Sequence, residues 1–252
     1  MKKIYLFLTA LMLCIAAGAQ TTIKGDVNGD GTVDIADVTE VVNIILNPDS
    51  DDDTPTLPDT PTTDSRAVDL GLSVKWASCN VGATAPEEYG GYYAWGETEE
   101  KSDYSWDTYK YYNSTSTSMT KYCTRVAYGT VDNKTTLEPT DDVATVKWGG
   151  SWRMPTNDEQ QELKNKCTWT WTTLNGVSGY RVTGPNGNSI FLPAAGYRYG
   201  TEVYNQDPMG YYWPSSLDSD NYRAYYFVFY RGYYELFSTF RYSGFSVRPV
   251  CP

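Results

Sequence analysis

Histidine is absent from the 252 residues of this sequence. Its absence excludes catalytic triads that use a histidine base and zinc sites with histidine ligands. Basic clusters are absent as well, which argues against nucleic acid and anionic membrane surfaces as partners. Any chemistry would have to rely on carboxylates, tyrosine, lysine or cysteine. Because no catalytic constellation is recognisable among these residue types, we do not expect an enzyme.

Apolar runs of membrane-spanning length are also absent. Residues 1–19 begin with Met, Lys2 and Lys3, continue with a short apolar stretch and end on small residues, which is typical of a secretory signal peptide. Ala17 and Ala19 fit the cleavage rule and predict that the exported chain begins at Gln20. We therefore expect an extracellular, cell-surface or periplasmic protein without a transmembrane anchor.

Cysteine is scarce after this segment, and its wide spacings fit no metal motif. In an exported chain the four remaining cysteines permit up to two disulfides in three possible pairings, and buried free thiols are the alternative. These residues are Cys79, Cys123, Cys167 and Cys251.

Acidic residues are concentrated near the N-terminus, where eleven acids and one lysine lie between Gln20 and Asp64. The stretch DVNGDGTVDIAD places oxygen-bearing side chains at alternate positions of a twelve-residue loop, the arrangement that Ca²⁺ requires. Gly31 stands at the sixth position, where the backbone must turn sharply. The expected Ca²⁺ ligands are Asp26, Asn28, Asp30, Thr32 through its carbonyl, Asp34 through water, and Asp37.

A helix is predicted directly after this loop, because Val38, Val41 and Ile45 recur at the spacing of one helical face. A loop closed by aspartate and followed at once by a helix resembles a dockerin repeat, here over about residues 24–47. The resemblance implies calcium binding and a cohesin-like partner. A dockerin has two such repeats and this chain shows one, so pairing with a half-dockerin on another chain, or a purely structural helix, is the alternative. We assign residues 20–47 to this half repeat.

The remainder of the chain reads as a linker and one domain. Residues 48–64 consist mainly of proline, threonine and aspartate, which predicts an extended linker. In residues 65–252, short apolar stretches alternate with Gly, Asn, Asp and Ser, so many short strands and long loops are expected. One helix is predicted to begin after Thr156, where Glu159 completes a capping box. Leu163 is expected on the buried side of this helix.

Several short sequence motifs of this domain occur in a characteristic order: VDLGLSVKWASCNVGA, EEYGGYYAWGE, GGSWRMPTNDEQQEL, SIFLPAAGYR, GYYWPSS and YSGFSVRPV. In this order they resemble the Fibrobacter succinogenes major paralogous domain over nearly all of residues 66–250. The resemblance implies an α+β, C-type-lectin-like fold with short mixed and antiparallel strands, one or two helices and a loop-rich ligand face. Arg153 and Arg248 lie in two of these motifs, and we interpret them as folding residues paired inside the domain. We interpret residues 245–248 as a half-buried last strand.

Half of the residues from Asn221 to Tyr242 are aromatic. Alternation along this segment places Tyr225, Phe227 and Phe229 on one face, which we assign to the core. The tyrosines of the other face suit recognition, because each offers a rigid ring and a hydroxyl, although a core packed on both faces is the alternative. The candidate ligand-binding residues are Tyr212, Tyr222, Tyr226, Tyr230, Tyr233, Tyr234 and Tyr242.

Together these features predict a secreted or surface-displayed binding protein, adhesin-like or lectin-like, with an unknown protein or glycan ligand and a calcium-binding tether. The family resemblance further implies that residues 211–242 could be diversified by a retroelement. One alternative is a polysaccharide-degrading enzyme or an accessory module of a carbohydrate-active complex; another is a structural surface protein. The carboxylates that an enzyme could pair are Glu97, Glu99, Glu202 and Asp207.

Overall fold

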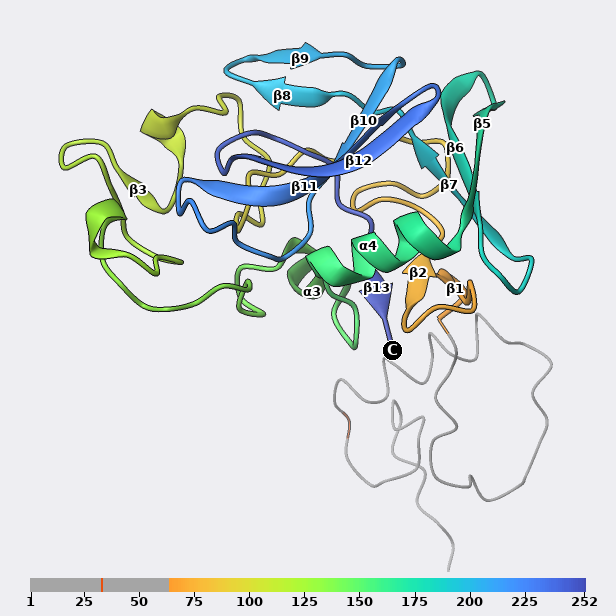
Figure 1. Cartoon of the computed structure of the whole chain (residues 1–252), viewed down its shortest axis with the longest axis horizontal. Coiled ribbons are helices and arrows are strands. Elements are labelled where there is room, and N and C mark those ends of the chain that lie inside the picture. The colour runs from red at the N-terminus through yellow and green to blue at the C-terminus, as the bar shows by residue number, and fades with distance from the viewer. Residues whose placement is uncertain (1–32, 34–63) are drawn as a thin grey trace, which may run out of the picture. The chain divides into compact units, whose positions relative to one another are not determined.

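The computed structural model describes Val33 and residues 64–252. The predicted signal peptide, and the calcium loop and linker apart from Val33 and Asp64, lie outside the described residues. The chain divides into two units, Met1–Pro61 and Thr62–Pro252. Every described helix and strand belongs to the second unit (Figure 1). None of these helices has both the length and the apolar composition of a membrane span.

Short elements make up the second unit. Its helices are η1 (Trp106–Thr108), η2 (Val126–Tyr128), α3 (Val143–Trp148) and α4 (Asn157–Lys166). Its first seven strands are β1 (Ala67–Val68), β2 (Lys75–Ala77), β3 (Tyr112–Asn113), β4 (Ser118–Met119), β5 (Thr168–Leu174), β6 (Val177–Thr183) and β7 (Ser189–Pro193). They are followed by β8 (Tyr197–Tyr199), β9 (Glu202–Tyr204), β10 (Met209–Tyr212), β11 (Arg223–Tyr230), β12 (Tyr233–Phe240) and β13 (Val250–Cys251).

Within residues 64–252 the strands form five small sheets, β1-β2-β13, β3-β4, β5-β6-β7, β8-β9 and β10-β11-β12. All their strand pairs are antiparallel. Figure 1 shows β10-β11-β12 across the middle of the unit, with β8-β9 above this sheet, β5-β6-β7 to one side and α4 below. Helix α4 contacts β11 and β12 directly. The longest strands thus lie between a helix on one side and the β8-β9 hairpin on the other.

The expected α+β, C-type-lectin-like fold is wrong. The described chain is β-rich, because its α-helices contribute only six and ten residues. Threonine, tryptophan, tyrosine and phenylalanine make up most of residues 168–174 and more than half of residues 223–240, and these residue types favour strands. Tight turns limit the length of the strands: Asn175 and Gly176, at φ of 48° and 87°, form the two-residue turn that joins β5 to β6.

Helix α4 forms where the sequence predicts it. The Thr156 hydroxyl accepts a hydrogen bond from the Glu159 amide at 3.2 Å, and the Glu159 carboxylate accepts one from the Thr156 amide at 2.7 Å, which confirms the capping box. Leu163 is buried, as predicted. Arg153 donates two hydrogen bonds of 2.6 and 2.7 Å to Glu159, which confirms its interpretation as a paired folding residue.

Arg248 is also inside the domain, but its partners are neutral. Its guanidinium donates to the Asn80 side-chain oxygen at 2.8 Å and to the carbonyls of Ala77 and Phe191 at 3.0 and 2.8 Å. The predicted half-buried strand over residues 245–248 is wrong, since all four residues are buried. The reason is that these carbonyl and amide oxygens converge on Arg248 from other segments and satisfy its donors.

The four cysteines of the described residues are free thiols, so the free-thiol alternative of the sequence analysis holds. Cys79, Cys123 and Cys251 are buried, and Cys167 is half-buried at the end of α4. Burial raises the pKa of the Cys167 thiol to about 11, and burial also raises the pKa of Cys251. These two thiols therefore stay protonated near neutral pH and are poor nucleophiles.

Asp141 is the centre of a buried charged cluster and is 4% exposed. Its carboxylate accepts hydrogen bonds from the Tyr122 hydroxyl at 2.7 Å and from the ammonium groups of Lys110 and Lys121 at 3.1 and 2.5 Å. Burial by itself would raise the pKa of this carboxyl, but the hydrogen bonds, above all that from Lys121, hold the pKa well below its ordinary range.

Asp141→Asn is expected to lower the free energy of unfolding by about 2–3 kcal/mol at pH 7, because two lysines lose their buried partner. A carboxyl with a lowered folded-state pKa stabilises the fold above its ordinary pKa of about 4 and loses this contribution as the pH falls further. The difference between wild type and variant should therefore shrink below pH 4. Urea unfolding at pH 7 and pH 3, with exposed Asp107→Asn as control, measures it. An equal difference at both pH values would contradict the prediction.

Candidate functional site

Strands β11 and β12 form a long hairpin whose two faces differ. Gly232 has a φ of 83° in the turn, a conformation that a side chain would strain. Phe227 and Phe229 share one face and are 3% and 0% exposed, which confirms the predicted core face. They pack against Trp169 of β5, at ring-centroid distances of 5.2 and 6.5 Å. Tyr225, predicted to share this core, is half-buried.

The opposite face of the hairpin carries exposed aromatic rings. The register places Tyr226 opposite Phe237 and Tyr230 opposite Tyr233. Tyr230 and Tyr233 stack with their centroids 4.8 Å apart, and they are 42% and 36% exposed. Phe237 is 46% exposed. Tyr226 is half-buried because its ring also packs against Phe245, at 5.3 Å.

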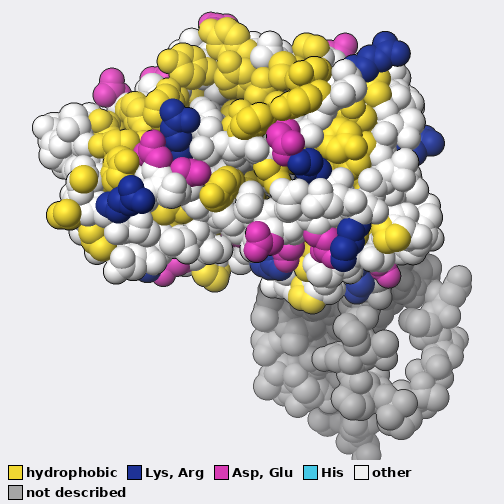
Figure 2. Space-filling view, viewed as in Figure 1, with side chains coloured by type: hydrophobic (Ala, Val, Ile, Leu, Met, Phe, Trp, Pro, Cys, Tyr) yellow, Lys and Arg dark blue, Asp and Glu magenta, His cyan; other side chains and the backbone are white. Residues whose placement is uncertain are grey.

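Further tyrosines extend this face beyond the hairpin. Tyr211 of β10 stacks on Tyr226 at 6.1 Å, Tyr197 of β8 lies 4.8 Å from Tyr211, and Tyr204 of β9 stacks on Tyr197 at 5.6 Å. Figure 2 shows hydrophobic side chains gathered over β8, β9, β10 and β12. Tyr199 of β8 lies 6.5 Å from Tyr204 and is 51% exposed. We call this face the aromatic surface, and its residues are Tyr197, Tyr199, Tyr204, Tyr211, Tyr226, Tyr230, Tyr233 and Phe237.

The side chains that define the aromatic surface are uncharged, and Glu235, which the register places between Tyr233 and Phe237 on the same side of β12, is paired with Lys164. Burial raises the pKa of the Tyr197, Tyr211 and Tyr226 hydroxyls, so these groups stay protonated near neutral pH. Each protonated hydroxyl can donate and accept a hydrogen bond while its ring offers an apolar plane. The rings restrict one another through their mutual contacts. Such a surface can bind a flat, partly apolar and hydroxylated ligand without ion pairing.

Four of the predicted ligand-binding tyrosines lie elsewhere. Tyr222 and Tyr242 pack on Trp106, at centroid distances of 5.6 and 4.8 Å, and Tyr242 is only 6% exposed. Tyr212 is 2% exposed and donates to the Pro193 carbonyl at 2.8 Å, and burial raises its pKa to about 12. Tyr234 lies on the core face of the hairpin and stacks on Trp169 at 4.8 Å. These four side chains are used in packing and are not part of the aromatic surface.

The sequence analysis missed five members of the aromatic surface: Tyr197, Tyr199, Tyr204, Tyr211 and Phe237. A signal was present, because the stretch YRYGTEVY alternates tyrosine with polar residues around a glycine, as a hairpin does. What the sequence does not show is that this hairpin lies beside β10. Their proximity depends on a bridge between Gly196 and Gly210.

The carboxylates considered for an enzyme do not form one cluster. Glu97 and Glu99 line a shallow cleft, but each is ion-paired, Glu97 with Lys101 and Glu99 with Lys147. Glu202 and Asp207, in β9 and after it, are exposed and do not line that cleft. Within residues 64–252 no group of three acidic or cysteine side chains is placed to hold a metal ion.

The predicted Ca²⁺ ligands, Asp26, Asn28, Asp30, Thr32, Asp34 and Asp37, lie outside the described residues. The donor set itself fits calcium: four carboxylates, one amide oxygen and one backbone carbonyl are hard oxygen ligands, and neither sulfur nor imidazole is among them.

Comparison with known proteins bears on this segment. No curated protein and no solved structure matches the chain, so the resemblance of residues 66–250 to the paralogous domain has no support here. Type I dockerin domains bind calcium and cohesin partners, and they occur in secreted or cell-surface proteins. Residues 24–69 of this chain match the family Dockerin type I domain, which confirms the dockerin resemblance and extends it through the predicted linker to Asp69.

Proposed function

We propose that this chain is an exported, non-catalytic component of a carbohydrate-active complex, with a calcium-dependent docking segment and a polysaccharide-binding domain. The observation that carries the proposal is the dockerin type I match at residues 24–69, which overlaps the oxygen-rich loop from Asp26 to Asp37. Docking modules attach binding and catalytic domains to a common scaffold. The β-rich domain that follows carries the binding function of the chain.

The aromatic surface supports polysaccharide as the ligand of that domain. Pyranose rings present flat C–H faces with hydroxyls at their edges, and these match tyrosine rings that carry hydroxyl groups. The stacked pair Tyr230 and Tyr233 and the neighbouring Phe237 give three exposed rings on one rigid hairpin. Because the surface is neutral, binding should depend only weakly on salt.

Replacing Tyr230 and Tyr233 together by alanine is expected to weaken binding to an insoluble polysaccharide at least tenfold, since exposed aromatic anchors each contribute about 1–2 kcal/mol to recognition. Thermal unfolding should change little, because both rings are at least one-third exposed. Pull-down on cellulose, xylan and mannan, with the wild-type chain and the double variant, measures the loss.

Val126→Ala is the matched control, because Val126 is an apolar side chain 85% exposed outside the aromatic surface. Equal binding by wild type and the double variant, or binding to none of the three polysaccharides, would contradict the assignment. Capture of a protein ligand by the wild type and not by the double variant would replace polysaccharide by an adhesin-type partner at the same surface.

A further inference from the structure

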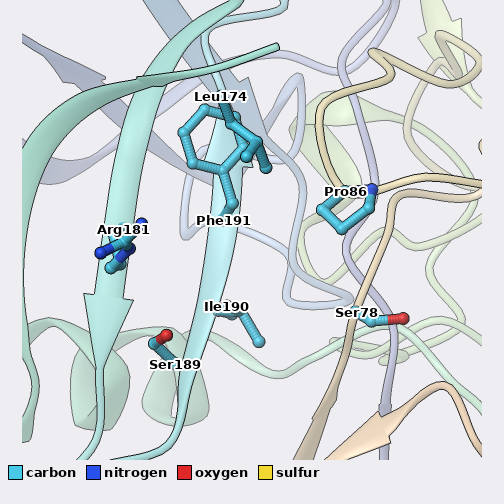
Figure 3. A pocket seen from close by; sticks show the side chains of 7 residues that line it. All are labelled: Ser78, Pro86, Leu174, Arg181, Ser189, Ile190 and Phe191. Atoms are coloured by element: carbon cyan, nitrogen blue, oxygen red, sulfur yellow. The ribbon is translucent and has the colours of Figure 1, made fainter.

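A second cleft lies on the β5-β6-β7 sheet, where it faces the loop that follows β2. Its volume is about 210 Å³, below the range of roughly 300–1,000 Å³ that drug-sized ligands occupy. Figure 3 shows Arg181, Ser189 and Phe191 on the strand side and Ser78 and Pro86 on the loop side. The space therefore suits a single compact residue rather than an extended chain.

Arg181 is the only charged side chain that lines this cleft. It stands opposite Phe191 in the register of β6 and β7, so both side chains lie on the same face of the sheet. Among residues 64–252 its guanidinium has neither an ion-pair partner nor a hydrogen-bond partner, although most other cations of this domain are paired. The hydroxyls of Ser78 and Ser189 likewise make no hydrogen bond there. Arg181 and Ser189 are exposed on the strand wall, and Ser78 is half-buried on the loop wall.

A second positive charge lies behind the cleft. The buried guanidinium of Arg248 bonds the carbonyls of Ala77 and Phe191, and so joins the two walls, and no carboxylate among the described residues neutralises it. The nearest acids of the loop are engaged elsewhere. Glu87 accepts from Asn175 at 2.6 Å, and Glu88 accepts from the Thr84 amide at 2.7 Å. Neutral donors leave both carboxylates charged, so Arg181 supplies the positive charge on the lining of the cleft while Glu87 and Glu88 carry negative charge on the adjoining loop.

We propose that this cleft binds a uronic acid residue, a sugar whose carboxylate pairs with Arg181. A planar carboxylate accepts two parallel hydrogen bonds from the guanidinium fork. Ser78 and Ser189 bond ring hydroxyls, and the apolar wall of Leu174, Pro86 and Phe191 contacts the C–H face of the ring. The site uses none of the residues of the aromatic surface. Its test is therefore independent of the test of polysaccharide binding.

Titration of the full chain with sodium D-glucuronate, followed by amide chemical shifts, tests this site. We expect saturable shifts at residues 78–86 and 189–191, and weaker or no binding of D-glucose, acetate and sulfate. Arg181→Gln should reduce glucuronate affinity at least tenfold, the loss expected for a charge-assisted pair of about 1.5–3 kcal/mol. Exposed Arg125→Gln is the matched control and should bind like wild type. Ser189→Ala should weaken binding in the same direction while leaving Arg181 in place.

Each alternative result has a definite meaning. Absence of binding by glucuronate would overturn the proposal, as would an unchanged affinity in Arg181→Gln. Acetate binding as tightly as glucuronate would overturn the sugar assignment, and tighter binding of sulfate would overturn the carboxylate assignment. Glucuronate binding that is retained in the Tyr230 and Tyr233 double variant and lost in Arg181→Gln would support the cleft even where no polysaccharide binds the aromatic surface.

Discussion

Arg241→Met should lower the free energy of unfolding by about 3 kcal/mol, because several carbonyls in the core would lose their donor. Arg241 is 0% exposed. Its guanidinium donates to the carbonyls of Lys121, Tyr122 and Asn221 at 3.0, 3.2 and 3.0 Å and to the Tyr109 hydroxyl at 2.9 Å. It therefore ties the end of β12 to segments about 20 and 120 residues earlier in the chain.

Two effects oppose each other at Arg241. Removal of a buried charge that lacks a carboxylate partner recovers some desolvation cost. Against this, the guanidinium lies 4.9 Å from the Trp95 ring centroid and 5.3 Å from that of Tyr109, and both contacts would be lost. Because methionine fills similar volume but donates no hydrogen bond, three carbonyls would stay buried without a partner. We expect the unsatisfied carbonyls to dominate.

Urea unfolding at pH 7 measures this change. Arg223→Met is the matched control, because Arg223 is half-exposed and its ion pair with Asp220 should contribute less than about 1 kcal/mol. A change at Arg241 no larger than that at Arg223 would show that the buried carbonyls find other donors, and would refute the account of this core.

Features that depend on local spacing can be predicted from this sequence, whereas the burial of Arg241 cannot. The capping box at Thr156 and the buried parity of Phe227 and Phe229 follow from local spacing, and both are confirmed. Burial of Arg241 does not follow, since a charged side chain can be buried only where acceptors from distant segments converge. No local pattern of residues specifies that convergence.

At the candidate site, the pairing of strands likewise decides which tyrosines are exposed. Tyr212 and Tyr230 look alike in sequence, yet Tyr212 pairs with Phe227 in the β10–β11 register and shares its core face. A shift of one residue in that register would have exposed Tyr212 and buried Tyr211. The sequence therefore predicts a tyrosine-rich face, while the pairing of distant strands determines which tyrosines are exposed on it.

Asp30→Ala should weaken Ca²⁺ binding by about a hundredfold or more, since the number of charged ligands tunes the affinity of such loops over several orders of magnitude. Asp30 is the third predicted side-chain ligand, directly before the turn at Gly31. Calorimetric titration of the chain with Ca²⁺ measures the loss. Asp107→Ala removes the same charge from an exposed position outside the matched residues 24–69 and should bind calcium like wild type.

We expect docking to require bound calcium. In our proposal the loop orders the predicted helix that presents Val38, Val41 and Ile45. Both EDTA and Asp30→Ala should therefore abolish capture by an immobilised cohesin domain, while Asp107→Ala should not. A chain with a single repeat has a second route, in which two half repeats pair with each other. Calcium-dependent dimerisation in size-exclusion chromatography without cohesin capture would favour that route. Capture that persists in EDTA would refute calcium-dependent docking, because a loop with four carboxylates repels itself unless a cation neutralises it.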